Sequence, residues 1–313
     1  MDLSVVSTLY RTAGFLDEFY TRVCSSAEKA VGSFEIILVN DGSPDDALAR
    51  AVALHERDPR VVVVDLSRNF GHHKAMMTGM GNARGDFVFL IDSDLEEPPG
   101  LLHAFLEKLR REHADVVYGI QRQRRGGAFE RLSGEIFYWL VDRLCDVKLP
   151  RNLVTARLMT KRYVRNLVRH REREVIMAGL WQITGFHQVP IEVDKHRAKK
   201  PSSYLTLRKM VLAVDFITSF SSVILHFVLY LGLAIAALAF LALAVLVLRY
   251  VGGTHPPEGW TSVIASVWLF GGLSIFFIGL VGIYVARIFN EVKRRPYTIV
   301  RDLYRRAPDG TRS

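Results

Sequence analysis

Two aspartates separated by one serine follow an apolar run that is typical of a buried strand. Asp92 and Asp94 come directly after Phe87–Ile91. In extended backbone the side chains at i and i+2 point the same way, so these carboxylates repel each other unless a cation lies between them. Mg²⁺ is usually held by one or two carboxylates together with substrate phosphates. The spacing therefore predicts a site for a divalent cation and a diphosphate, and the alternative is a solvated Asp–Ser turn.

Short apolar runs alternate with helical stretches from Leu3 to Tyr118. We expect strands at Leu3–Ser7, Glu35–Val39, Val61–Leu66, Phe87–Ile91 and Val116–Tyr118. We expect helices at Phe15–Val31, Asp46–Glu56, Lys74–Ala83 and Leu101–Glu112. This alternation predicts an α/β fold, with a mostly parallel sheet that carries helices on both faces.

A second acidic site follows the second expected strand. Asp41 lies in Asn40–Ser43, directly after the apolar run Ile36–Val39. Ligands of parallel sheets bind beyond the carboxyl ends of the strands, which is where Asp41 and Asp92 both stand. No Gly-x-Gly-x-x-Gly follows the first strand, which argues against a nicotinamide-dependent dehydrogenase.

Two apolar runs near the C-terminus are each long enough to cross a membrane. Val223–Leu248 contains one His, His226, and no Asp, Glu, Lys or Arg, and Thr261–Ala286 contains none of these five residue types. Basic residues precede the first run and follow the second, whereas the connector Val251–Trp260 has no Lys or Arg. The positive-inside rule then predicts two spans in a cytoplasmic (inner) membrane, with both termini and the α/β domain cytoplasmic. The alternative is a pair of buried core helices.

The net charge of +9 on 313 residues does not by itself indicate a nucleic-acid partner. Much of the excess lies beside the expected spans, where basic side chains are attracted to anionic membrane lipids. No zinc-finger spacing or helix-turn-helix pattern is present, so we expect no nucleic-acid partner. Cys24 and Cys145 are interpreted as packing residues of a reduced domain.

Several segments together resemble the family-2 inverting glycosyltransferases, and more narrowly the polyprenyl-phosphate glycosyltransferases related to dolichol-phosphate mannose synthase. Val39–Ser43 and Leu90–Pro99 carry the resemblance most clearly. It continues in order through Asp115–Gly119, Arg157–Met159, Arg197–Tyr204, the two apolar runs and Glu291–Pro296.

The resemblance implies a GT-A fold, in which one Rossmann-like sheet holds the nucleotide sugar. The expected organisation is a cytoplasmic GT-A domain over 1–203, an interfacial amphipathic helix over 204–222, two transmembrane helices over 223–286 and a basic cytoplasmic tail over 287–313. The two spans would cover about 223–248 and 261–286.

The donor half of the implied site is formed by residues that follow the first, second and fourth strands. Asp41 would contact the base or ribose, and Thr8, Tyr10, Asp92 and Ser93 would also bind the nucleotide sugar. Asp92 and Asp94 would hold Mg²⁺ or Mn²⁺. Glu96 stands where the family typically has Gln and would be a third metal ligand or cap the next helix. The first strand's usual Pro-x-Tyr-Asn-Glu ending keeps only Tyr10 here.

The acceptor half is implied by basic and hydroxyl residues further along the chain. Arg122, Arg125, Thr155, Ser202 and Tyr204 would bind the acceptor or a phosphate, and Asp94, Arg157 and Arg197 would be catalytic. Guanidinium groups suit bidentate phosphate binding. Thr155 replaces a family Asp that acts near the acceptor, which a polyprenyl phosphate tolerates because its oxygen is already ionised and needs no general base.

The function implied is transfer of a sugar from a UDP- or GDP-sugar to undecaprenyl phosphate or a similar lipid, for cell-envelope glycan or lipid modification. One alternative is a processive polysaccharide synthase, although its Gln-x-x-Arg-Trp motif and extra spans are missing. Another is a non-catalytic membrane protein that binds nucleotide sugar. The sugar, the base and the oligomeric state, a homo-oligomer included, stay open.

Overall fold

The chain divides into two compact units. The structure, a computed structural model, describes residues 1–121, 135, 138–139, 141–145, 148–173, 175–194, 223–252 and 259–306. The first unit comprises Met1–Tyr138, Val147–Leu205 and Arg295–Ser313, and the second comprises Trp139–Asp146 and Thr206–Arg294. The predicted interfacial helix over 204–222 lies outside the described residues.

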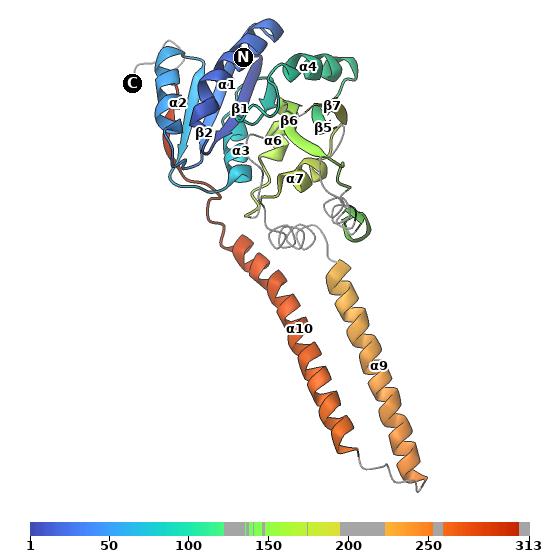
Figure 1. Cartoon of the computed structure of the whole chain (residues 1–313). Helices are drawn as coiled ribbons and strands as arrows, with labels where there is room; N and C mark the ends of the chain where they lie inside the picture. Colours follow the sequence, from blue (N-terminus) through green and yellow to red (C-terminus); the bar gives the residue numbers. More distant parts are fainter. Residues whose placement is uncertain are drawn as a thin grey trace. The chain divides into compact units, whose positions relative to one another are not determined.

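An eight-stranded sheet forms the centre of the first unit (Figure 1). Its strands are β1 (Leu3–Leu9), β2 (Phe34–Asn40), β3 (Val61–Leu66), β4 (Phe87–Leu90), β5 (Val116–Gln121), β6 (Leu153–Thr160), β7 (Gln188–Val193) and β8 (Val300–Tyr304). They lie in the order β7-β5-β6-β4-β1-β2-β3-β8. β6 and β8 run antiparallel to their neighbours, and the other pairings are parallel.

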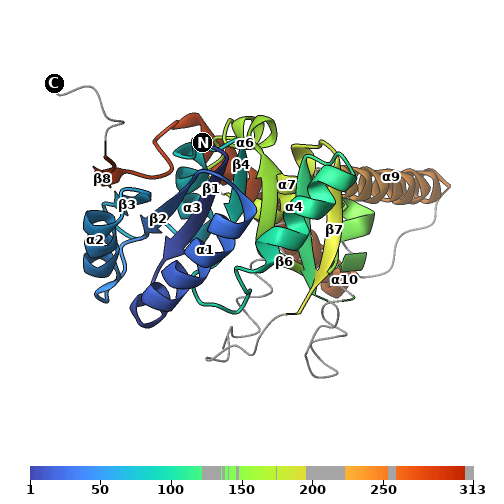
Figure 2. The same ribbon diagram turned by 90° about the horizontal axis from the view of Figure 1, so that it is seen from above.

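Helices cover both faces of the sheet (Figure 2). One core contains side chains of α1 (Leu16–Ala30), α2 (Ala47–Arg57) and α4 (Leu101–Arg111). The other contains side chains of α3 (His72–Gly81), α6 (Lys161–Leu167) and α7 (Met177–Ile183). Because both faces are covered, β1, β2 and β3 are buried along their whole length, which explains their almost continuous apolar sequences.

The predicted α/β sheet is confirmed, but it is larger than the sequence indicated. All five expected strands are present, and β6, β7 and β8 are additional. β8 comes from the segment that was predicted to be a basic tail over 287–313, and it pairs antiparallel with β3. Part of that segment therefore belongs to the α/β domain.

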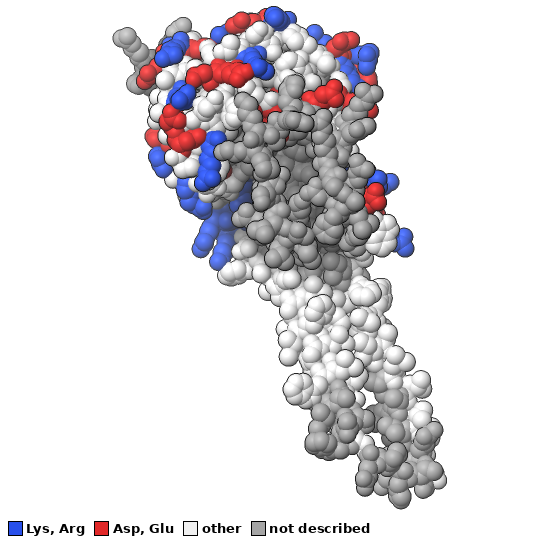
Figure 3. All heavy atoms as spheres, in the orientation of Figure 1, with Lys and Arg blue, Asp and Glu red and all other residues white. Residues whose placement is uncertain are grey.

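The second unit contains two long helices. α9 spans Val223–Val251 and α10 spans Trp260–Val292. Among the described residues, one segment, Ser266–Val292, meets the length and hydropathy expected of a membrane span. The two-span arrangement over 223–286 therefore stays a prediction. Figure 3 shows charged side chains interspersed over the first unit, whereas the described surface of these helices is almost entirely uncharged.

Candidate functional site

The turn that follows β4 is fixed to the neighbouring strand β1. The backbone N–H of Ile91 donates to the carbonyl of Val6 at 3.1 Å, which extends the pairing by one residue. The hydroxyl of Ser93 is buried and donates to the carbonyl of Thr8 at 2.9 Å. Ser93, predicted to bind the nucleotide sugar, thus anchors the turn that presents Asp92 and Asp94.

His72 links that turn to helix α3. It is the first residue of α3, and its Nε2 lies 3.4 Å from Oδ1 of Asp92. Its Nδ1 lies 2.9 Å from Oγ1 of Thr8. The sequence alone does not reveal this bridge, because the bridge depends on the parallel pairing of β1 and β4. His72 thus links Thr8 with Asp92, both of which were predicted to bind the donor.

The carboxylates proposed as metal ligands follow β4, and Asp94 lies in a turn. Oδ1 of Asp94 accepts a hydrogen bond from the backbone N–H of Glu96 at 3.0 Å. In the described part of the chain, no three His, Cys, Asp or Glu side chains are grouped so that they could hold a metal ion. The set of Asp92, Asp94 and Glu96 is therefore not assembled as three ligands. Two partly exposed carboxylates still fit a cation that completes its coordination with substrate phosphates.

Asp41 organises the loop that precedes α3. Its carboxylate is buried and accepts hydrogen bonds from the backbone N–H of Phe70 at 2.7 Å and of Gly71 at 3.0 Å. Burial raises the pKa of Asp41, and these two hydrogen bonds oppose the rise. The structure therefore gives Asp41 a loop-holding role, and its predicted contact with the base or ribose stays a prediction.

Glu97 is a buried carboxylate that the sequence interpretation overlooked. It accepts hydrogen bonds from the backbone N–H of Thr155 at 3.1 Å and of Ala156 at 2.7 Å. It therefore fixes the start of β6 against the turn that carries Asp92. The sequence signal was a second Glu beside Glu96, but its partners lie almost 60 residues further along the chain.

Arg157, predicted to be catalytic, is buried and does not lie at the surface. It pairs with Leu90 across β6 and β4, and its side chain is 1% exposed. Its guanidinium lies over the ring of Trp181, and Nη2 has no hydrogen-bond partner among the described residues. Burial lowers the pKa of Arg157 to about 9. Direct contact of this group with donor or acceptor would require the packing around it to open.

The remaining predicted residues divide into one exposed side chain and five undescribed ones. Tyr10 follows β1 and is 43% exposed, with the guanidinium of Arg11 5.5 Å from its ring centre. Its position leaves the ring available to a ligand at this edge. Five predicted phosphate-binding or catalytic residues lie outside the described residues: Arg122, Arg125, Arg197, Ser202 and Tyr204.

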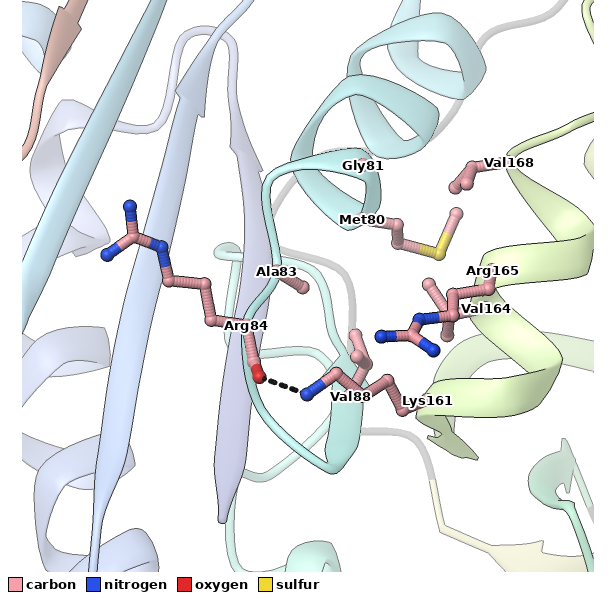
Figure 4. A pocket seen from close by; sticks show the side chains of 9 residues that line it. All are labelled: Met80, Gly81, Ala83, Arg84, Val88, Lys161, Val164, Arg165 and Val168. Carbon is pink, nitrogen blue, oxygen red and sulfur yellow. Dashed lines mark hydrogen bonds between the residues drawn. The ribbon is translucent and has the colours of Figure 1, made fainter. Parts of the chain in front are cut away.

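A separate cavity of about 340 Å³ lies near the start of β4, away from the turn that carries Asp92 (Figure 4). Its lining combines apolar side chains such as Met80 and Val164 with the basic residues Arg84, Lys161 and Arg165. Nζ of Lys161 donates to the carbonyl of Arg84 at 2.8 Å. No residue of the predicted donor site lines this cavity.

Known proteins similar to this chain are glycosyltransferases. The family described as "Glycosyl transferase family 2" matches residues 4–169. The chain is 51% identical over 304 residues to a Mycobacterium tuberculosis protein named "Putative glycosyltransferases", covering 97% of this chain and 89% of that protein. It is 32% identical over 310 residues to the SfII prophage-derived bactoprenol glucosyl transferase of Shigella flexneri, covering 98% of this chain and 100% of that protein.

The matched region contains the strands whose carboxyl ends carry Thr8, Asp41 and Asp92. The family match covers more than half of the chain, and the first relative extends over nearly all of it. The family predicted from the sequence motifs is confirmed: the chain belongs to glycosyltransferase family 2.

Proposed function

We propose that this chain transfers a sugar from a UDP- or GDP-sugar to a polyprenyl phosphate, with inversion at the anomeric carbon. The observation that carries the proposal is the Asp92–Ser93–Asp94 turn at the carboxyl end of β4, held to β1 by Ser93 and to α3 by His72. The similarity to bactoprenol glucosyl transferases supports the lipid acceptor and makes a glucosyl donor the first to test.

The donor would lie at the edge of the sheet where β1, β2 and β4 end. Thr8 and Tyr10 lie at the end of β1, and Asp41 follows β2 beside the loop that it holds. An exposed aromatic ring and backbone N–H groups suit a nucleotide. The carboxylates of the turn and the diphosphate are both negatively charged, so the diphosphate can bind there only when a cation lies between them. Asp92 and Asp94, with Glu96 nearby, would hold Mg²⁺ or Mn²⁺. Such a cation supplies charge stabilisation for the departing nucleoside diphosphate.

The reaction forms one bond and breaks one bond at the anomeric carbon. An oxygen of the lipid phosphate attacks that carbon, and the bond to the donor diphosphate breaks with its electron pair leaving on the nucleoside diphosphate. A phosphate oxygen is ionised at neutral pH, so no proton has to be removed during the attack. Thr155, which is a poor base, is compatible with that acceptor.

A membrane anchor serves this chemistry because the acceptor phosphate is held at a lipid surface. We propose that α9 and α10 both span the inner membrane, with both termini and the catalytic domain on the cytoplasmic side. The apolar composition of the two helices, the basic residues that flank them and the absence of Lys and Arg from the connector support this topology.

Transfer of label to lipid tests the proposal. Membranes that contain the protein would receive labelled UDP-glucose, UDP-N-acetylglucosamine or GDP-mannose with undecaprenyl phosphate and Mg²⁺, and organic-extractable label would be counted. We expect one donor to label the lipid, and chelation of the divalent cation to stop the transfer. No lipid label from any of the three donors would contradict the proposal.

A further inference from the structure

The segment that follows α10 reaches the loop that precedes α3. The backbone N–H of Ser67 donates to the carbonyl of Ile299 at 2.9 Å, and Nη2 of Arg301 donates to the carbonyl of Ser67 at 2.7 Å. Thr298 Oγ1 lies 2.8 Å from Thr78 Oγ1 on α3. The segment after α10 therefore binds both the N–H and the carbonyl of Ser67, at the start of the loop. It also contacts α3, the helix that follows the loop.

Arg301 also faces a buried carboxylate at the end of β3. The side chain of Asp65 is 2% exposed, and its Oδ2 lies 3.5 Å from Nη1 of Arg301. Its Oδ1 accepts a hydrogen bond from Nδ2 of Asn40 at 2.7 Å. Oδ1 of Asn40 in turn accepts one from the backbone N–H of Ser43 at 3.1 Å. A buried carboxylate is costly without a compensating charge, so Arg301 stabilises the arrangement of Asp65 and Asn40.

The loop that begins at Ser67 packs directly on the turn that contains Asp41. Gly42 has φ +58°, and a Cβ at this position would lie 2.4 Å from the backbone N of Asn69. Asp41 binds the N–H groups of Phe70 and Gly71, and His72 follows with its ring between Thr8 and Asp92. An unbroken series of contacts therefore runs from Arg301 through this loop to the carboxylate proposed to hold the donor's cation.

We propose that Arg301 is a positioning residue for donor binding, which acts by fixing the 67–71 loop and hence Asp41 and His72. The inference rests on the proposed function for the identity of the donor, but the ordering of the loop can be measured without it. Arg301 is 55% exposed on its side chain, so its removal should leave the core of the domain in place.

Arg301→Ala, Arg301→Lys and Arg306→Ala provide a matched test in the full-length protein. Arg306 belongs to the same segment, but its Nη2 donates to the carbonyl of Glu56 on α2, away from the loop. UDP and GDP binding would be measured by calorimetry, donor KM and kcat by lipid labelling, and loop order by hydrogen exchange of residues 67–72.

For Arg301→Ala we expect binding of the preferred nucleotide to weaken and donor KM to rise by about fivefold, which corresponds to a modest coupling between Arg301 and the donor site. We expect kcat to stay within about twofold, because Arg301 does not touch the reacting groups. Exchange of residues 67–72 should accelerate. Arg301→Lys should restore part of both effects, and Arg306→Ala should match the wild type.

Unchanged nucleotide binding and exchange in Arg301→Ala would overturn the inference. Equal changes in Arg301→Ala and Arg306→Ala would also overturn it, since they would indicate a general effect of the C-terminal strand. If the wild type bound neither nucleotide, the proposed donor class would fail, and the exchange comparison alone would decide whether Arg301 fixes the loop.

Discussion

Neighbouring carboxylates after β4 have different surroundings, so we expect them to have different roles. Asp92 and Asp94 are partly exposed at the edge of the sheet, whereas Glu97 is buried. Both oxygens of Glu97 accept hydrogen bonds from backbone N–H groups of β6, which is not expected of an exposed ligand of a cation. Asp92 and Asp94 are therefore the candidates for ligand binding, and Glu97 has a structural role.

Glu97→Gln should destabilise the protein more than Glu96→Gln. The amide introduced at position 97 would direct one N–H group toward a backbone N–H of β6, which leaves a buried donor unpaired at a cost of about 2 kcal/mol. Thermal unfolding of the two full-length variants in detergent measures the difference. Equal melting temperatures for the two variants would contradict a structural role for Glu97.

At the residue scale, the sequence predicted the places of Asp41 and Asp92 in the sheet better than their contacts. The positions of Asp41 and Asp92 after buried strands follow from local patterns, and the structure places both at one edge of the sheet. The loop-holding role of Asp41 and the bridge made by His72 depend on pairing between distant segments, which no local pattern contains. The burial of Arg157 depends likewise on Trp181, more than 20 residues further along the chain.

At the element scale, the strands missed from the sequence share weak local signals. β6 contains Thr155 and Arg157 among its apolar residues, which interrupts the expected pattern. β7 contains Pro190, which is tolerated because β7 lies at the edge of the sheet. β8 is short and carries Arg301 and Asp302, so it is typical of a basic tail until its pairing with β3 is known.

Asp115 connects β5 with the end of β6 and with α6, and this connection should depend on pH. Nη2 of Arg162 donates to Asp115 at 2.7 Å, and hydrogen bonding to Arg162 is the largest cause of the lowered pKa of Asp115. Because the pKa of Asp115 is lower in the folded than in the unfolded protein, the carboxylate stabilises the fold at pH values above its unfolded pKa. This stabilisation is lost as the pH falls through the folded pKa.

Asp115→Asn should therefore lower the stability by about 1 kcal/mol at pH 7, with a difference from the wild type that shrinks below about pH 4. Asp86→Asn is the matched control, because Asp86 pairs with Lys161 but is 66% exposed. Melting temperatures at pH 7, 5 and 3.5 measure the effect. If Asp115→Asn were destabilised relative to the wild type as strongly at pH 3.5 as at pH 7, the interaction of ionised Asp115 with Arg162 would not be the cause.

At the scale of the whole molecule, the proposed topology requires the short connector between α9 and α10 to lie outside the cytoplasm. Thr254→Cys in the connector should react with a membrane-impermeant maleimide in intact cells. Ser313→Cys at the C-terminus should react only after permeabilisation. The native Cys24 and Cys145 are buried and give a low background. Labelling of both introduced cysteines in intact cells, or of neither, would contradict the two-span arrangement.

Chemistry at the Asp92–Ser93–Asp94 turn is central to the proposed function. The most direct test is transfer of labelled sugar to undecaprenyl phosphate by the purified full-length protein, compared with Asp94→Asn at equal protein concentration. We predict a sugar-linked lipid phosphate from the wild type, identified by its mass, and a loss of at least about a hundredfold in rate for Asp94→Asn. Equal rates for the two proteins, or sugar released only into water, would contradict the proposed site and acceptor.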